Sequence, residues 1–178
     1  MYRLFVAIDL PDDVRAGLAD LCFGIPGAKW VPPEQIHLTL RFIGEVDGAI
    51  FQDISETLAD LRTPGFSLRL KGVGHFPPRK PPRVLWVGVE PQPVLIQLRN
   101  KVETALIRLG LLPEGRKFAP HITLARLHNT PLNKIGNFLA GNSLFECPPF
   151  PVATFQLYSS VLTPKGAIHT IETVYPLG

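Results

Sequence analysis

The sequence contains few cysteines and no long apolar run, and both features narrow the classes of protein that it can encode. Its two cysteines, Cys22 and Cys147, are too few for a disulfide framework or a four-cysteine metal site. No apolar stretch approaches the roughly 20 residues that cross a bilayer. The first residues, MYRLFVAIDLPDD, lack the pattern of a signal peptide. We therefore expect a reduced, cytoplasmic protein without a membrane segment.

Charged residues are also scarce, and neither sign forms a long block. Asp, Glu, Lys and Arg make up 19% of the chain and hydrophobic residues 46%, so the 178 residues suffice for one sizeable core. The net charge of +3 permits a polyanionic partner without requiring one. Three cations lie between prolines in FPPRKPPR, residues 76–83, and this pattern predicts an extended, exposed loop.

Strand-like and helix-like patterns alternate along the chain. Short apolar runs closed by proline or glycine predict strands, whereas apolar residues spaced by three or four predict helices. The expected strands are 3–10, 36–44, 65–76, 83–91, 121–127, 153–161 and 168–174, and the expected helices are 11–23, 49–61, 93–109 and 132–140.

The order of these elements occurs twice. Aligning Asp9 with Glu90 gives an offset of 81 residues, and aligning His37 with His121 gives 84. This near-constant offset predicts one domain built from a duplication, with repeat units at about 1–76 and 83–175. No glycine-rich phosphate fingerprint follows the first strand, which favours an α+β sheet protein over a dinucleotide-binding fold.

Each repeat unit carries one His-x-Thr-Leu motif, HLTL at 37–40 and HITL at 121–124. Because successive side chains of a strand point to opposite faces, the histidine and threonine of each motif share one face. The two aliphatic residues share the other face and anchor the strand in the core. If a pseudo-twofold axis relates the copies, two imidazoles and two hydroxyls converge on one cleft.

Two histidines facing one cleft can perform acid–base chemistry, because the unperturbed imidazole pKa is near 6.5. In-line displacement at phosphorus requires one ring to activate water and the other to protonate the leaving oxygen. Thr39 and Thr123, with Arg126, would bind the non-bridging phosphate oxygens. A zinc site is the other use of two histidines, but HExxH and CxxC motifs are absent and we expect no metal.

Three further residues lie near the repeated strands or in the last one. Phe42 and Trp86 could stack on a base, and core packing is the alternative for both. His169 is expected to be a surface or hydrogen-bonded residue.

The chain resembles the two-histidine (2H) phosphoesterase superfamily, and within it the RNA 2',3'-cyclic phosphodiesterases, also called 2'-5' RNA ligases. The stretches that carry the resemblance are RLFVAIDLP, KWVPPEQIHLTLRFIGEV, GVGHFPPRKPPRVLWVGV and KFAPHITLAR. They cover most of the chain in the family's order. The resemblance implies a bilobal, duplicated α+β fold in which two pseudo-symmetric antiparallel sheets, flanked by helices, face a central cleft. It also implies that no cofactor is needed.

The same resemblance implies a role for each motif residue. His37 would be the general acid that protonates the 3' oxygen, and His121 would be the base that activates water, so that a 2'-phosphate is the product. Thr39 and Thr123 match the family's threonines without a departure. Arg126 matches a position that contacts the phosphate or the nucleotide.

We therefore expect a metal-independent, monomeric hydrolase that opens the 2',3'-cyclic phosphates of RNA ends or nucleotides to 2'-phosphomonoesters. Reversible 2'-5' ligation would use the same histidines, with a 5' hydroxyl in place of water. One alternative is a phosphodiesterase for a small cyclic phosphate such as ADP-ribose 1'',2''-cyclic phosphate. Another is a non-catalytic module that binds RNA ends, although such a module would not need a matched acid and base.

Overall fold

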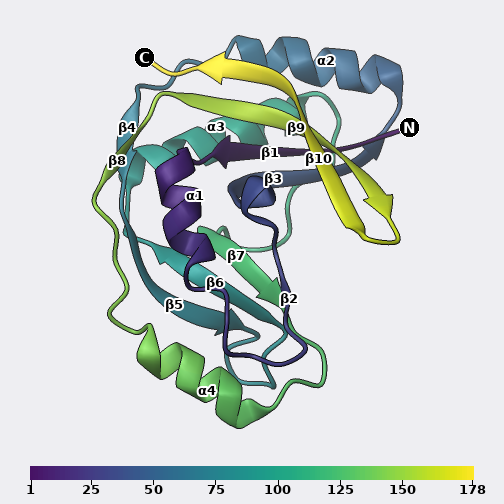
Figure 1. The fold of residues 1–178 in the computed structure, drawn as a ribbon. Helices are drawn as coiled ribbons and strands as arrows, with labels where there is room; N and C mark the ends of the chain where they lie inside the picture. The colour runs from purple at the N-terminus through teal and green to yellow at the C-terminus, as the bar shows by residue number, and fades with distance from the viewer.

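The strands form two four-stranded antiparallel sheets and one small two-stranded sheet in the computed structural model, which describes residues 1–178. The first sheet, ordered β10-β9-β1-β3, contains β1 (Tyr2–Asp9), β3 (His37–Val46), β9 (Thr154–Thr163) and β10 (Gly166–Pro176). The second, ordered β2-β7-β6-β5, contains β2 (Lys29–Trp30), β5 (Leu70–Phe76), β6 (Val84–Val89) and β7 (His121–Arg126). The small sheet pairs β4 (Phe66–Leu68) with β8 (Phe150–Val152). Figure 1 shows the first sheet in the upper lobe and the second in the lower lobe.

Four helices accompany the sheets. They are α1 (Asp12–Ala19), α2 (Gly48–Ala59), α3 (Pro93–Arg108) and α4 (Leu132–Gly141), and α4 lies at the bottom of the lower lobe in Figure 1. Helix α3 is amphipathic, with Leu95, Leu98 and Leu106 fully buried on one stripe. Helix α2 begins after Asp47, whose carboxylate accepts a hydrogen bond from the backbone N–H of Ile50 at 2.9 Å. No helix combines the length and apolarity needed to cross a membrane.

One continuous core of 31 buried residues joins both sheets. In β1, the alternate residues Leu4, Val6 and Ile8 point into this core. Leu38 of β3 and Ile122 of β7, the second residues of the two motifs, are fully buried in it as well. The first sheet and the second sheet therefore cover the same core, and the motif histidines lie on their opposite faces.

The two sheets exchange strands between the halves of the sequence. Strand β5 precedes the proline loop but pairs with β6, whereas β9, from the end of the chain, pairs with β1 on one side and with β10 on the other. Equivalent places in the two sheets are occupied by β1 and β6, by β3 and β7, and by β9 and β5. Each predicted repeat unit, 1–76 and 83–175, thus contributes strands to both sheets.

Most predicted elements agree with the observed ones to within about two residues, with three differences. The helix expected at 11–23 ends at Ala19, after which the backbone continues in tighter three-residue turns. The single strand expected at 65–76 is divided into β4 and β5, which belong to different sheets. Strands β2 and β8 were not predicted, because two or three residues are too few to show a periodic pattern.

Candidate active site

The two motif histidines are the first residues of β3 and β7, and these strands contact each other. The segment before β3 holds the start of β3 close to β7, because this segment contains β2 and β2 pairs with β7. The backbone N–H of Val31 then donates to the carbonyl of Leu124 at 2.8 Å. A single 3-10 turn, Pro33–Gln35, leads from there to His37. The start of β3 is therefore tied to the strand that carries His121.

Both imidazoles are held by the same backbone contact. Nδ1 of His37 lies 2.7 Å from the carbonyl oxygen of Gln35, and Nδ1 of His121 lies 2.7 Å from that of Ala119. Because a carbonyl oxygen only accepts hydrogen bonds, each Nδ1 donates its proton to it. Each neutral ring therefore keeps the lone pair on Nε2, which can accept a proton. The repeated contact gives the two rings the same tautomer.

Side chains of the first sheet surround His37. The ring of Phe5 stacks on it at a centroid distance of 5.0 Å, and Tyr158 lies at 5.7 Å. His169 meets it edge-on at 5.3 Å. Burial lowers the pKa of His37 to about 4, and His169 contributes to the lowering, whereas the backbone hydrogen bond and Asp9 oppose it. His37 is therefore neutral at neutral pH in the free protein.

The prediction for His169 was wrong. Its Nδ1 is buried and makes no hydrogen bond within the protein, and its ring contacts Phe5 as well as His37. Pairing with Ser160 of β9 places it on this side of the sheet, and burial lowers its pKa, with Arg3 adding to the effect. No motif surrounds His169 in the sequence, so only the pairing of β10 with β9 and of β9 with β1 reveals it.

Aromatic side chains of the second sheet lie beside His121. Phe76 meets its ring edge-on at 4.9 Å, and Trp86 lies at 6.5 Å and packs against Phe76 at 5.5 Å. Trp86 lies across Gly74, where a Cβ atom would come within 2.2 Å of the indole. Position 74 therefore requires glycine. Trp86 also pairs with Thr123, which places the indole on the motif face of the sheet.

A β-bulge interrupts the second motif. Trp86 of β6 pairs with Thr123, but the adjacent residue Leu85 pairs with Ala125, so that Leu124 is an extra residue of β7. Strict alternation would place Arg126 on the core side of the strand. The bulge instead buries two consecutive residues and returns the exposed Arg126 to the face of Thr123. The predicted phosphate ligands of this strand share one face only because of the bulge.

The first motif contains the same bulge. Thr39 pairs with Ala7, whereas Arg41 pairs with Val6, which leaves Leu40 as the extra residue of β3. Leu40 and Arg41 are both buried, as are their counterparts in β7. The two motif strands are therefore bent at equivalent points.

Phe42 occupies the position in the first sheet that Arg126 occupies in the second. It pairs with Phe5 and is 44% exposed, and the guanidinium of Arg3 lies 5.1 Å from its ring centroid. The two repeat units thus carry equivalent His–Thr pairs. They differ after the bulge, where the first unit has the aromatic ring of Phe42 and the second has the guanidinium of Arg126.

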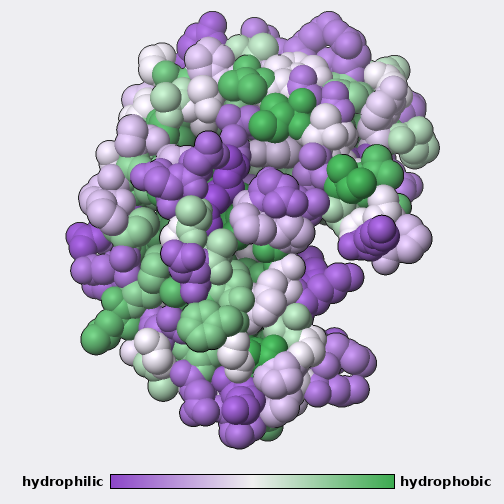
Figure 2. Space-filling view, in the orientation of Figure 1, coloured by the Kyte–Doolittle hydropathy of each residue, from purple (hydrophilic) through white to green (hydrophobic).

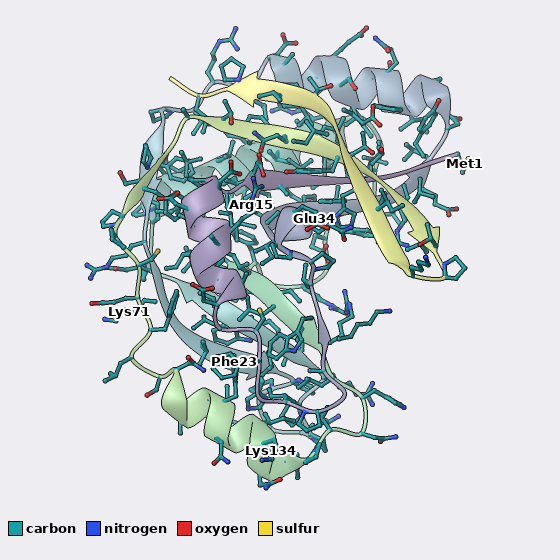
Figure 3. The ribbon with its side chains drawn as sticks, in the orientation of Figure 1. Met1, Arg15, Phe23, Glu34, Lys71 and Lys134 are labelled. Carbon is teal, nitrogen blue, oxygen red and sulfur yellow. The ribbon has the colours of Figure 1, made fainter.

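Asp9, at the end of β1, connects the histidine strand to helix α1. It pairs with His37 across the strands, and its backbone N–H donates to Oε1 of Gln156 at 2.8 Å. Arg15 of α1, labelled in Figure 3, forms an ion pair with the Asp9 carboxylate at 2.5 Å. The start of β3 is therefore braced on both sides, by β7 and by this end of β1.

The lowered pKa of His37 predicts an acid-sensitive stability. Above about pH 6.5 the ring is neutral in both the folded and the unfolded chain and contributes nothing. As the pH falls from about 6.5 to about 4, the unfolded chain binds a proton that the folded site resists, so the free energy of unfolding decreases. Between about pH 7 and pH 4.5, the free energy of unfolding measured with urea should decrease by about 2 kcal/mol less in His37→Gln than in the wild type.

The matched control for this experiment is His128→Gln, which removes an exposed imidazole two residues beyond β7. Its loss of stability on acidification should equal that of the wild type. Equal losses in all three proteins would show that burial of His37 does not govern the acid response.

The chain is similar to known phosphoesterases over nearly its whole length. The model of the LigT-like phosphoesterase family matches it twice, over residues 8–86 and 87–169, which agrees with the predicted duplication. An RNA 2',3'-cyclic phosphodiesterase of Archaeoglobus fulgidus is 36% identical, over 94% of this chain and 96% of its own length. A protein of the same name from Thermotoga maritima is also 36% identical, over 95% of this chain and 92% of its own.

Solved structures show the same fold. TT0787 of Thermus thermophilus has a TM-score of 0.80 and 32% identity, covering 98% of this chain and 97% of its own. E. coli LigT in its apo form has a TM-score of 0.80 and 29% identity, covering 99% and 97%. A complex of E. coli LigT with 3'-AMP has a TM-score of 0.77 and 30% identity, covering 99% and 98%. The predicted α+β fold with two antiparallel sheets is confirmed.

Proposed function

The chain belongs to the LigT-like phosphoesterase family, and on this premise we propose that it hydrolyses RNA 2',3'-cyclic phosphate ends to 2'-phosphomonoesters. The observation that carries the proposal is the pair of equivalent imidazoles, each with Nδ1 bonded to a backbone carbonyl at 2.7 Å. The two relatives described above bear the name of this activity and match more than nine tenths of the chain.

The proposed reaction is an in-line displacement at phosphorus. A water oxygen forms the new bond to phosphorus while the bond from phosphorus to the 3' oxygen breaks. One imidazole takes a proton from the water and the other gives a proton to the 3' oxygen, so the pair ends with its protons exchanged and the product keeps its 2'-phosphate. Each proton transfer contributes about 10²- to 10⁴-fold to the rate. The two histidines supply both transfers, and the mechanism assigns no step to a metal.

The resemblance assigns the acid role to His37 and the base role to His121, and we propose the roles in this order. His37 then takes up its proton together with the substrate, because an anionic phosphate beside a ring raises its pKa. The pKa of about 4 in the free protein would suit the opposite order, with His37 as the base. The two orders differ in which variant can be rescued by a better leaving group.

Thr39, Thr123 and Arg126 complete the proposed site. Their hydroxyl and guanidinium groups donate hydrogen bonds to the non-bridging oxygens, where negative charge increases as water attacks. Phe42 and Trp86 lie on the same faces and are proposed to contact the base of the terminal nucleotide.

Ligation is the same chemistry with an alcohol in place of water. A 5' hydroxyl held in line with the 3' oxygen of the cyclic phosphate would form the new bond to phosphorus while the bond to the 3' oxygen breaks, which gives a 2'-5' linkage. In the reverse direction the 3' hydroxyl attacks and the 5' oxygen leaves, with the same two histidines moving the protons. Since water is abundant and a positioned 5' hydroxyl is not, we propose hydrolysis as the main reaction.

Protein treated with EDTA is expected to open cytidine 2',3'-cyclic phosphate and a cyclic-phosphate-ended oligoribonucleotide as fast as untreated protein. Chromatographic assays of both substrates, with ADP-ribose 1'',2''-cyclic phosphate as a third, measure this. Activity that is lost in EDTA and restored by zinc would contradict the metal-independent mechanism. Turnover of the ADP-ribose compound alone would favour the small-molecule phosphodiesterase, and binding of RNA without turnover would leave the non-catalytic module.

A further inference from the structure

We propose that the RNA strand attached to the reacting phosphate runs over a basic rim of the second sheet, formed by Lys29, Arg79, Lys80 and Arg83 next to Arg126. This inference rests on the proposed function and adds the surface that binds the rest of the RNA strand. The rim makes oligoribonucleotide ends better substrates than nucleoside 2',3'-cyclic phosphates.

The rim begins with a row of paired residues across the second sheet. Lys29 of β2 pairs with Arg126, Arg126 pairs with Val84 of β6, and Val84 pairs with Phe76 of β5. Directly paired residues point to the same face of a sheet. This row therefore lies on the face that carries His121, further along β7, and it places two cations beside each other.

The loop from β5 to β6 extends this row. It adds the exposed side chains of Arg79, Lys80 and Arg83, and its residues line an open depression of ≈ 480 Å³. The N–H of Arg83 donates to the carbonyl of Phe76, and its carbonyl accepts from the N–H of Leu127, each at 2.8 Å. Four prolines restrict the backbone of residues 77–82. The loop therefore holds its cations outward on a stiff support, beside the end of β7.

No carboxylate forms an ion pair with the rim. All five cations are exposed, and the ion pairs of the protein involve other arginines. Asp and Glu are absent from positions 61–89 and 115–145, which contain β5, β6 and β7. The first sheet, in contrast, carries Asp9, Glu45 and Glu172. The positive charge is therefore concentrated in the lobe of His121.

The surface beside the rim is open. Figure 2 shows a notch on the right of the molecule, between the β9–β10 hairpin above and the ends of β2 and β7 below, with hydrophilic side chains along its lower border. A strand whose terminal phosphate lies at the histidines can leave the site in this direction without crossing the core.

Single-stranded RNA is the polyanion that this arrangement fits. Proteins that bind single strands combine a basic track for the phosphates with aromatic rings for the bases. Trp86 pairs with Thr123, which lies between Arg126 and His121, and the ring of Phe76 contacts that of His121, so both residues supply such rings. An acidic protein would not need a track that continues to the histidine, whereas the strand joined to the reacting phosphate does.

The test compares two triple variants with the same change of charge. Arg79→Gln/Lys80→Gln/Arg83→Gln removes three rim cations, and Arg62→Gln/Lys101→Gln/Arg108→Gln removes three exposed cations near helix α3, on the core side of the sheets. The value of kcat/KM is measured for cytidine 2',3'-cyclic phosphate and for a ten-nucleotide RNA ending in a cyclic phosphate. Salt is varied between about 50 and 200 mM.

The rim variant should lower the oligonucleotide-to-mononucleotide ratio of kcat/KM, whereas the control variant should keep the wild-type ratio. Each lost phosphate contact reduces the salt slope of single-strand binding by about 0.7, so the rim variant should reduce the oligonucleotide slope by about 2. When the salt concentration rises fourfold, kcat/KM for the oligonucleotide should therefore fall by a factor that is roughly 16-fold smaller in the rim variant than in the wild type.

The inference would be overturned if the rim variant kept the wild-type ratio of kcat/KM for the oligonucleotide and the mononucleotide. It would also be overturned if the control variant lowered this ratio as much as the rim variant does. A wild type that hydrolyses neither substrate would refute the proposed function instead, so the two failures are distinguishable. Circular dichroism of both variants confirms that the fold is retained, as expected for exposed side chains.

Discussion

Replacing His121 or His37 by alanine is expected to lower kcat for 2',3'-cyclic phosphate hydrolysis by about 10²- to 10⁴-fold in each case. Each substitution removes one of the two proton transfers, and the remaining imidazole cannot both take and give a proton in one displacement. Steady-state assays with cytidine 2',3'-cyclic phosphate measure the loss. Thermal unfolding followed by circular dichroism verifies that each variant is folded.

The control for both variants is His128→Ala, which removes an exposed histidine just beyond β7 and should retain wild-type kcat. Either motif variant with full activity would remove that histidine from the proposed pair. A loss in the control equal to that in the motif variants would show that the assay reports general damage.

A substrate with sulfur in place of the 3' oxygen separates the roles of the two histidines. A thiolate leaves without a proton, so loss of the acid should matter much less with this substrate, whereas loss of the base should matter as before. The proposed order predicts that the sulfur substrate restores most of the activity of His37→Ala and little of that of His121→Ala. The reverse pattern would make His37 the base, in agreement with its lowered pKa.

Replacing Glu103 by alanine is expected to lower the free energy of unfolding by about 3–5 kcal/mol. The carboxylate of Glu103 in α3 bonds to the guanidinium groups of Arg41 at 3.1 Å and Arg99 at 3.0 Å. The side chains of Arg41 and Glu103 are only 7% and 12% exposed. Without Glu103, two arginines remain in the interior without their carboxylate, and urea unfolding measures the cost.

This ion pair also supports the candidate site. Arg41 is the residue that the β3 bulge turns inward, two residues after Thr39. The Glu103→Ala variant should therefore lose activity at temperatures where it is still mostly folded. Glu56→Ala, which removes an exposed carboxylate on α2, is the control and should change stability by no more than about 0.5 kcal/mol. If Glu103→Ala also changed the free energy of unfolding by no more than about 0.5 kcal/mol, the stabilising role of the Arg41–Glu103 ion pair would be contradicted.

Local sequence patterns predicted the parts of the molecule that depend on neighbouring residues in the chain. The alternation of polar and aliphatic residues in HLTL and HITL predicted which side chains enter the core, and Leu38 and Ile122 are fully buried. The spacing between His37 and His121 predicted the duplication, which the double match to the family model supports. These features are local or repeated, so one sequence suffices to find them.

Features that depend on pairing between distant strands were not predicted. At Leu40 and Leu124, the motif strands contain one residue more than the stretches of β1 and β6 that pair with them. Neither motif shows this extra residue by itself, because it depends on the partner strand. His169 contacts His37 because β10 reaches the first sheet through β9. The exchange of strands between the repeat units is likewise a property of the complete sheets, since an offset between two copies does not say which copies pair.

The most direct test of the proposed function is phosphorus NMR of the product formed from cytidine 2',3'-cyclic phosphate in ¹⁸O-labelled water, in the presence of EDTA. In-line opening by water with departure of the 3' oxygen predicts a single product, cytidine 2'-phosphate, with one ¹⁸O atom on phosphorus. A 3'-phosphate product, a phosphate without the label or an absence of turnover in EDTA would contradict the proposal.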